Sequence, residues 1–127
     1  MKHQILIVDD EPNILRLLEY NLKDKYDIVL KNDGVEALLW LQEGNFPSVI
    51  VTDIMMPNMD GIELIKNIRG SGAFRDIPII FLSAKSQSED RIKGLKEGAD
   101  DYIVKPFNPE ELKIRIENLL KRSSVKM

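Results

Sequence analysis

The chain has 127 residues, 43% hydrophobic and 31% charged, which predicts one globular domain large enough to bury a core. Its formal net charge of -3 argues against direct binding of nucleic acid by this chain. The absence of cysteine excludes a disulfide framework and a thiolate metal site, and fits a reducing, cytoplasmic location. No apolar stretch approaches the roughly 18 residues of a membrane span, so we expect no membrane partner.

Strand-like and helix-like segments alternate along the whole chain. Short runs rich in Val and Ile predict five strands, at residues 4–8, 26–31, 49–52, 77–82 and 102–104. The strand at residues 26–31 is more polar than the others, which is typical of an edge strand.

Five helices are predicted between and after these strands. The first begins at Pro12, which suits the first helical position. Asp33 and Asn108 are expected to cap the second and fifth helices, with Glu36 and Glu111 completing capping boxes. The third follows a turn at residues 57–61, and the fourth begins near residue 88.

This alternation predicts an α/β fold of the flavodoxin-like type, a doubly wound parallel sheet with helices on both faces. Right-handed crossovers and the edge-like second strand favour the strand order 2-1-3-4-5, with a switch point between the first and third strands. We expect residues 1–122 to form the domain and residues 123–127 to be a short tail or the start of a linker.

Four of the predicted strands end at a reactive side chain. The first ends at Asp9 and Asp10, the third at Asp53, the fourth at Ser83 and the fifth at Lys105. The carboxyl ends of parallel strands share one edge, where open α/β sheets bind their ligands. We therefore expect three carboxylates, a hydroxyl and an ammonium group to gather at that edge.

Closely spaced carboxylates repel one another unless a cation lies among them or one is protonated. With no cysteine and with His3 far upstream, the ligands would all be oxygen, which favours Mg²⁺ and an accompanying phosphate. Asp53 is the carboxylate best placed to attack a phosphoryl group, giving an aspartyl phosphate. Lys105 would then neutralise the phosphate, and Ser83 would donate a hydrogen bond to it.

Each of these residues, taken alone, also fits an ordinary structural role. Asp10 is equally well explained as a helix cap, and Asp53 as a turn residue. Ser83 and Lys105 are common loop and surface residues. The coincidence of four strand ends with complementary charges favours a shared site. Trp40, on the second predicted helix, is expected to pack partly into the core.

Four motifs together resemble the receiver domain of two-component response regulators, and the resemblance covers residues 2–122. They are ILIVDDE at residues 5–11, DIMMPNMDG at 53–61, SA at 83–84 and KPF at 105–107. Each motif is modest alone, but their order and spacing are specific.

The resemblance implies a phosphorylation-controlled signalling module that catalyses only its own phosphorylation and dephosphorylation, and not a turnover enzyme. A sensor histidine kinase or phosphotransfer protein would donate the phosphoryl group to Asp53, and Lys105 would pair with it. The implied ligands of Mg²⁺ are Asp9, Asp10, Asp53 and the backbone carbonyl of Met55.

The resemblance also implies a conformational switch. Ser83 would shift toward the phosphate and Tyr102 would rotate inward behind it, which changes the surface of the fourth helix, fifth strand and fifth helix. That surface resembles the charged dimer face of regulators joined to winged-helix DNA-binding domains, with a solvated charged face as the alternative. The charged residues concerned are Arg91, Asp100, Asp101, Glu111, Arg115 and Arg122.

Four further sites in the sequence bear on the resemblance. Ser83 stands where threonine is frequent, so the hydroxyl is kept and a methyl group is lost. Met55 and Lys85 occupy positions that tune phosphate lifetime in the family, and we expect Met55 to shield the acyl phosphate from water. Lys105-Pro106 resembles the cis peptide site of the family.

Two other classes of protein compete with this interpretation. An aspartate-nucleophile phosphohydrolase would need an acid for its leaving group, often two residues after the nucleophile, and Met55 stands there. A flavin-binding electron carrier of the same topology would need a phosphate-cradling loop after the first strand. The sequence DDEP at residues 9–12 repels phosphate unless a metal intervenes.

Overall fold

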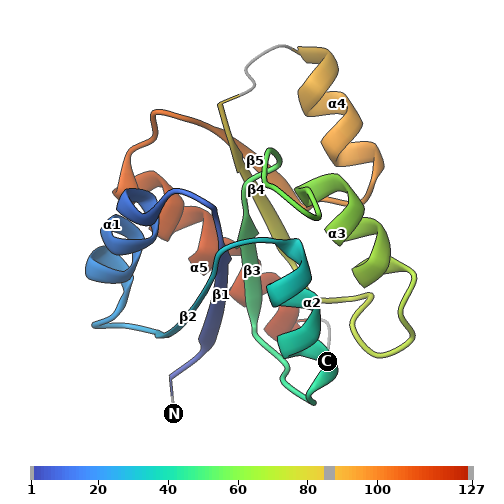
Figure 1. Ribbon diagram of the computed structural model, residues 1–127. Coiled ribbons are helices and arrows are strands. Elements are labelled where there is room, and N and C mark those ends of the chain that lie inside the picture. The colour runs from blue at the N-terminus through green and yellow to red at the C-terminus, as the bar shows by residue number, and fades with distance from the viewer. Residues whose placement is uncertain (1, 85–87, 126–127) are drawn as a thin grey trace.

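The computed structural model describes residues 2–84 and 88–125 (Figure 1). Within this part of the chain, parallel strands pair in the order β2-β1-β3-β4-β5, which confirms the predicted doubly wound topology. The strands are β1 (Gln4–Val8), β2 (Asp27–Lys31), β3 (Val49–Thr52), β4 (Ile79–Ser83) and β5 (Asp101–Val104). β2 is the least buried strand, as an edge strand should be.

The helices are α1 (Pro12–Leu22), α2 (Gly34–Gln42), α3 (Gly61–Arg69), α4 (Ser88–Lys96) and α5 (Pro109–Val125). α5 extends three residues past the expected domain end at residue 122. β4 begins at Ile79 and not at residue 77, since Pro78 has no N–H to donate to a ladder. No helix in the described ranges is long and apolar enough to cross a membrane.

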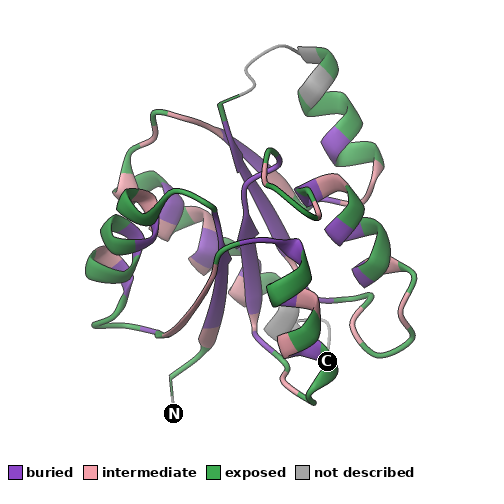
Figure 2. Ribbon diagram, viewed as in Figure 1, coloured by how far each residue is buried: buried purple, intermediate pink, exposed green. Residues whose placement is uncertain are grey.

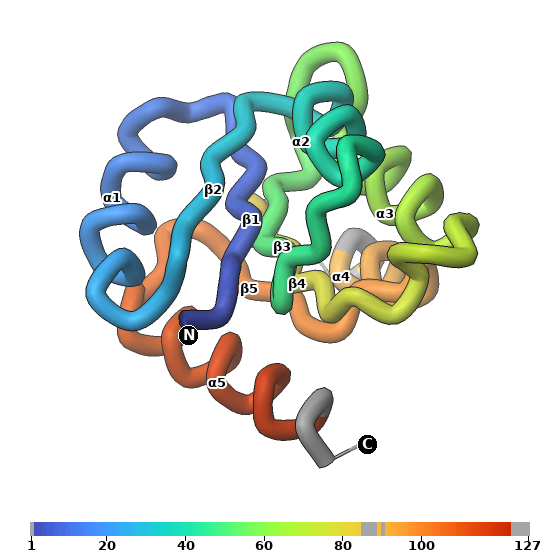
Figure 3. Tube along the Cα trace, turned by 90° about the horizontal axis from the view of Figure 1, so that it is seen from below, coloured from blue at the N-terminus to red at the C-terminus, as the bar shows by residue number. Residues whose placement is uncertain are grey.

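The sheet is covered on both faces, as expected. α1 and α5 lie on one side, and α2, α3 and α4 lie on the other (Figure 3). Alternate residues of each strand point to opposite faces of the sheet. In β1, Ile5 and Ile7 belong to the hydrophobic cluster under α1 and α5, whereas Leu6 and Val8 belong to the cluster under α2 and α3. The central strands are buried along their length (Figure 2). Trp40 is half-buried against the second cluster, as predicted.

Two helices begin at an aspartate that caps them. Asp33 accepts a hydrogen bond from the backbone N–H of Glu36 at 2.9 Å, as predicted, and Asp60 caps α3 in the same way. The Glu36 carboxylate, however, accepts from the N–H of Asn32 at 3.1 Å, one residue before the position a capping box requires. At α5, Asn108 accepts from the N–H of Glu110 at 2.9 Å.

Besides the Glu36 capping box, two more of the sequence interpretations about helix starts are wrong. Glu111 does not extend the Asn108 cap into a box; its carboxylate lies 3.5 Å from the guanidinium of Arg115. The cap position of α1 is Glu11, without a side-chain cap bond, so the role of Asp10 as a helix cap is not realised. The Asp10 side chain is thereby left exposed at the carboxyl edge of the sheet.

A glycine lets α4 lie close to the sheet. A Cβ atom added at Gly94 would lie 2.9 Å from Cδ2 of Phe81 and 3.3 Å from Cδ2 of Tyr102. The two rings meet edge to face, with centroids 6.3 Å apart. Gly94 therefore provides the space in which the aromatic pair packs under α4.

Candidate functional site

Three carboxylates meet at the carboxyl ends of β1 and β3, the upper edge of the sheet in Figure 1. Asp9, Asp10 and Asp53 each offer a carboxylate oxygen within 4.8 Å of the others. Asp9 is 1% exposed and Asp53 5% exposed, while Asp10 faces solvent. The gathering of carboxylates predicted from the strand ends is confirmed.

Lys105 brings a positive charge into this cluster from the end of β5. Its Nζ atom lies 2.9 Å from Oδ2 of Asp9 and 3.3 Å from Oδ2 of Asp53. A third carboxylate, that of Glu11, lies 3.4 Å from the same nitrogen. The Lys105 side chain is 11% exposed, so it is a member of the site and not a solvated surface lysine.

Backbone N–H groups hold the other oxygen of each buried carboxylate. The N–H of Glu11 donates to Oδ1 of Asp9 at 2.9 Å, and the N–H of Ile54 donates to Oδ1 of Asp53 at 2.7 Å. Each carboxylate is thus fixed between a backbone donor on one oxygen and the ammonium of Lys105 on the other. Both groups are oriented before any ligand binds.

The electrostatics of the site reflect this crowding. Burial raises the pKa of Asp53, and the nearby charge of Asp9 adds to the increase while Lys105 opposes it. Burial likewise raises the pKa of Asp9. Burial works to lower the pKa of Lys105, but hydrogen bonds and charges from Asp9 and Asp53 outweigh it, and that pKa is raised.

The donor set of the cluster fits a hard divalent cation. Asp9, Asp10 and Asp53 offer oxygen ligands only, which is the set that Mg²⁺ prefers. The Lys105 ammonium contacts Asp9, Glu11 and Asp53, and Asp10 also belongs to the cluster, so among the described residues negative charge remains in excess. A cation would offset the repulsion between the carboxylates, which adds to the effect of burial in raising the pKa of Asp53.

Ser83 and Tyr102, the other predicted site residues, lie on β4 and β5. Ser83 is the last residue of β4, is fully buried, and its backbone carbonyl accepts from the N–H of Lys105 at 2.7 Å. Tyr102 pairs with Phe81 in the β4–β5 register and is 7% exposed. The Lys105-Pro106 peptide is cis, as the resemblance implied. Lys85 falls outside the described residues.

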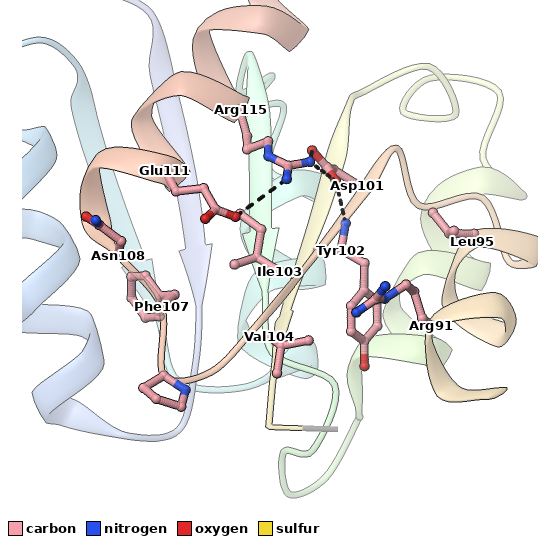
Figure 4. A pocket seen from close by; sticks show the side chains of 11 residues that line it. Arg91, Leu95, Asp101, Tyr102, Ile103, Val104, Phe107, Asn108, Glu111 and Arg115 are labelled. Atoms are coloured by element: carbon pink, nitrogen blue, oxygen red, sulfur yellow. Dashed lines mark hydrogen bonds and ion pairs between the residues drawn. The ribbon is translucent and has the colours of Figure 1, made fainter. Parts of the chain in front are cut away.

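A cavity of about 600 Å³ lies between α4, β5 and α5. Figure 4 shows Arg91 approaching it from α4 and Arg115 from α5. The Arg115 guanidinium donates to both carboxylate oxygens of Asp101 at 2.9 Å, and the Arg91 guanidinium lies 6.0 Å from the ring centroid of Tyr102. Arg115 and Arg91 therefore already have partners within the chain.

Sequence reasoning missed two features near the carboxylates. The first is the contact of Glu11 with Lys105, which the position of Glu11 in the ILIVDDE motif could have suggested. The second is a hydrogen bond from Asn58 to Asp33, which joins residues 25 positions apart. The signal for Asn58 was the turn sequence before Gly61, because asparagine tolerates the left-handed backbone conformation.

Comparisons with known proteins agree with the geometry. A family model described as the response regulator receiver domain matches residues 5–117. The alkaline phosphatase synthesis transcriptional regulatory protein PhoP of Bacillus subtilis is 44% identical over 126 residues, which are 98% of this chain and 51% of that protein. The transcriptional regulatory protein SrrA of Staphylococcus aureus is 41% identical, over 97% of this chain and 50% of that protein. The chain spans about half the length of these curated relatives.

Solved structures show the same fold. The chemotaxis response regulator CheY4 of Vibrio cholerae superposes with a TM-score of 0.88 at 33% identity, covering 94% of this chain and 100% of that one. The receiver domain of the Francisella response regulator 1452 has a TM-score of 0.88 at 40% identity, covering 96% of this chain and 99% of that one.

Proposed function

Because this chain belongs to the response regulator receiver domain family, we propose that Asp53 accepts a phosphoryl group from a sensor histidine kinase or a phosphotransfer protein. The observation that carries the proposal is the arrangement of Lys105, whose ammonium lies within 3.3 Å of carboxylate oxygens of both Asp9 and Asp53. A cation held beside a buried carboxylate can neutralise a new phosphoryl group there.

The chemistry is a transfer between two side chains. An oxygen of the Asp53 carboxylate forms a bond to phosphorus while the P–N bond to the donor imidazole breaks, and the imidazole nitrogen takes up a proton. Asp9, Asp10, Asp53 and the backbone carbonyl of Met55 would hold Mg²⁺. When bound, the ion neutralises charge on the phosphoryl oxygens. Lys105 leaves its contact with Asp53 to pair with the phosphoryl group.

The same residues argue against a turnover enzyme. A phosphohydrolase needs an acid beside its nucleophile to protonate the leaving group, and Met55, two residues after Asp53, is 60% exposed and has no such proton. Lys105 is engaged by three carboxylates. We therefore propose a module whose only substrate is its own Asp53, and whose catalysis covers its own phosphorylation and dephosphorylation.

Intact-mass spectrometry after incubation with Mg²⁺ and acetyl phosphate tests this function. We expect one labile adduct with the mass of a phosphoryl group, absent in Asp53→Asn and in wild type treated with a chelator. Steady phosphate release without an adduct would instead indicate a phosphohydrolase. A yellow protein that retains flavin through purification would indicate the electron carrier.

We further propose that phosphorylation changes the surface of α4, β5 and α5, with Ser83 shifting toward the phosphoryl group and Tyr102, which is already only 7% exposed, turning further inward. The contacts of Arg115 with Asp101 and of Arg91 with Tyr102 lie on this surface, so a change there would free charged groups to pair across a homodimer. Sedimentation velocity with and without acetyl phosphate tests this step, with Asp53→Asn as the control. An unchanged profile for phosphorylated wild type would contradict it.

A further inference from the structure

The loop between β3 and α3 is tied to the start of α2. Nδ2 of Asn58 donates a hydrogen bond to Oδ2 of Asp33 at 2.7 Å. Beside it, the backbone N–H of Gly34 donates to the carbonyl of Met59 at 3.2 Å. The two bonds join the loop that follows Asp53 to the first residues of another helix.

The geometry of Asn58 shows that its side-chain bond holds an uncommon backbone conformation. Its φ is 67°, and within the described residues it is the one non-glycine residue with positive φ. Asparagine tolerates this region better than most residues, but at some cost. The partner carboxylate, Asp33, is 7% exposed and accepts from the N–H of Glu36 through its other oxygen. Both oxygens of a buried carboxylate are thus engaged, one of them by the loop.

The contacts around this bond leave the loop little freedom. A Cβ atom at Gly34 would lie 2.7 Å from the carbonyl oxygen of Met59, so the N-terminal end of α2 is already in contact with the loop between β3 and α3. The base of the loop is closed by a hydrogen bond from the N–H of Gly61 to the carbonyl of Ile54 at 2.8 Å. Met55 lies between Ile54, which is bonded to Gly61, and Asn58, which is bonded to Asp33. Its backbone position therefore depends on these two hydrogen bonds.

We propose that Asp33 and Asn58 are positioning residues for the metal and phosphoryl site. Their hydrogen bond fixes the conformation of residues 54–60 and, through it, the direction of the Met55 carbonyl beside Asp53. This inference rests on the proposed function, since it concerns the same site. Neither residue touches the metal or the phosphoryl group, and both act through the backbone of the loop.

The test uses variants that separate this bond from helix capping and backbone strain. Asp33→Ser keeps a capping hydroxyl for α2 but is too short to reach Asn58. Asn58→Gly removes the amide group and relieves the positive φ, so the variant is expected to fold. Asp33→Asn loses the same charge as Asp33→Ser, yet its amide oxygen can still accept from the N–H of Glu36 while its NH2 group donates to Oδ1 of Asn58, once the Asn58 amide has turned over. Asp60→Ser is the matched control, because it changes a helix-capping aspartate that is exposed.

Isothermal titration calorimetry with Mg²⁺ gives the readout, after circular dichroism has shown that each variant is folded. We expect Asp33→Ser and Asn58→Gly each to weaken Mg²⁺ binding by about 10-fold, the low end for groups that orient metal ligands. The double variant should bind no more weakly than either single variant, because both remove one interaction. The Mg²⁺ affinity of Asp33→Asn and of Asp60→Ser should stay within about 2-fold of wild type. Asp33→Asn loses a charge but keeps the hydrogen bond to Asn58, and Asp60→Ser loses a charge at the surface.

Three outcomes would overturn the inference, and the first two separate it from the proposed function. If wild type binds Mg²⁺ and gains the phosphoryl adduct, but Asn58→Gly and Asp33→Ser bind Mg²⁺ as wild type does, the positioning role fails and the proposed function stands. If wild type neither binds Mg²⁺ nor gains the adduct, the proposed function fails and the positioning role fails with it. Additive losses in the double variant would also contradict a single shared bond.

Discussion

The ammonium nitrogen of Lys105 lies 2.9 Å from Oδ2 of Asp9, although the two residues are 96 positions apart in the chain. Both side chains are nearly enclosed, with 11% and 2% of their surface exposed. An ion pair in such a place stabilises the fold little by itself, but removing one partner leaves an uncompensated buried charge.

Replacing Lys105 with methionine should therefore destabilise the metal-free protein. We expect the free energy of unfolding to fall by about 2–3 kcal/mol. This is somewhat less than for a fully buried pair, because water reaches the carboxyl edge of the sheet at the exposed side chain of Asp10. Urea unfolding with a chelator measures the loss, and adding Mg²⁺ should recover part of it, since another cation then faces the carboxylates.

The pair of Lys25 with Glu117 supplies a control for this variant. Their atoms are 2.7 Å apart, but the side chains are 61% and 38% exposed. Exposed ion pairs contribute about 0–1 kcal/mol, so Lys25→Met should have a small effect that Mg²⁺ leaves unchanged. Equal losses in Lys25→Met and Lys105→Met would show that the site does not depend on its buried lysine.

Asp53→Asn should shift stability in the opposite direction. Asp53 and Asp9 are buried together, and one carboxylate raises the pKa of the other. Removing the charge at position 53 relieves this repulsion, so we expect the metal-free variant to gain roughly 1 kcal/mol, in the range of other functional-site replacements. Thermal unfolding in chelator measures the gain, and the stabilisation by Mg²⁺ seen in wild type should shrink. A less stable variant would contradict the account of charge crowding.

Gly61→Ala should damage the junction of β3 and α3. A Cβ atom there would lie 2.3 Å from the backbone carbonyl oxygen of Asp53, closer than real atoms approach. We expect a loss of about 1–3 kcal/mol, as for other overpacked positions. Gly72→Ala is the control, because nothing lies within 4 Å of its added Cβ, and it should leave the urea midpoint nearly unchanged.

Met55→Asn should shorten the life of the phosphoryl adduct. The Met55 side chain is 60% exposed and follows Asp53 by two residues, so it can cover the acyl phosphate, whereas asparagine can hydrogen-bond a water there. The decay of the adduct after removal of acetyl phosphate, followed by intact mass, measures this. A variant that loses phosphate no faster than wild type would refute the shielding role.

The pH dependence of stability should show the contribution of Asp33. The hydrogen bond from Glu36 and then that from Asn58 lower the pKa of Asp33 below its ordinary value of 3.8. A carboxyl with a lowered pKa stabilises the fold above its ordinary pKa and loses that effect as pH falls through the lower, folded value. Wild type should therefore exceed Asp33→Asn in stability at about pH 6, and the difference should shrink below about pH 4.

The sequence was sufficient for the topology because its signals are local and repeated. Strand runs, the Pro12 helix start and the Asp33 cap each depend on neighbouring residues, and chirality rules then leave few layouts. The ends of the strands placed Asp9, Asp53 and Lys105 at one edge without any knowledge of side-chain conformation.

The parts that could not be predicted depend on side-chain geometry across the fold. The bond of Asn58 to Asp33 requires a particular backbone angle and a meeting of two loops, neither of which a sequence pattern specifies. The sequence favoured neither of the two roles for Asp10, because a helix cap and a metal ligand both use a carboxylate oxygen. The structure separated them by placing the cap position of α1 at Glu11 and not at Asp10.

The glycine in α4 has one more consequence. A glycine inside a helix weakens it by roughly 1 kcal/mol relative to alanine, so α4 is held less by its own backbone than by what it rests on. It rests on the rings of Phe81 and Tyr102, at a separation that admits no methyl group. We therefore expect a change in the Tyr102 rotamer to displace α4, and a partner bound to the outer face of α4 to restrict the Tyr102 ring in return.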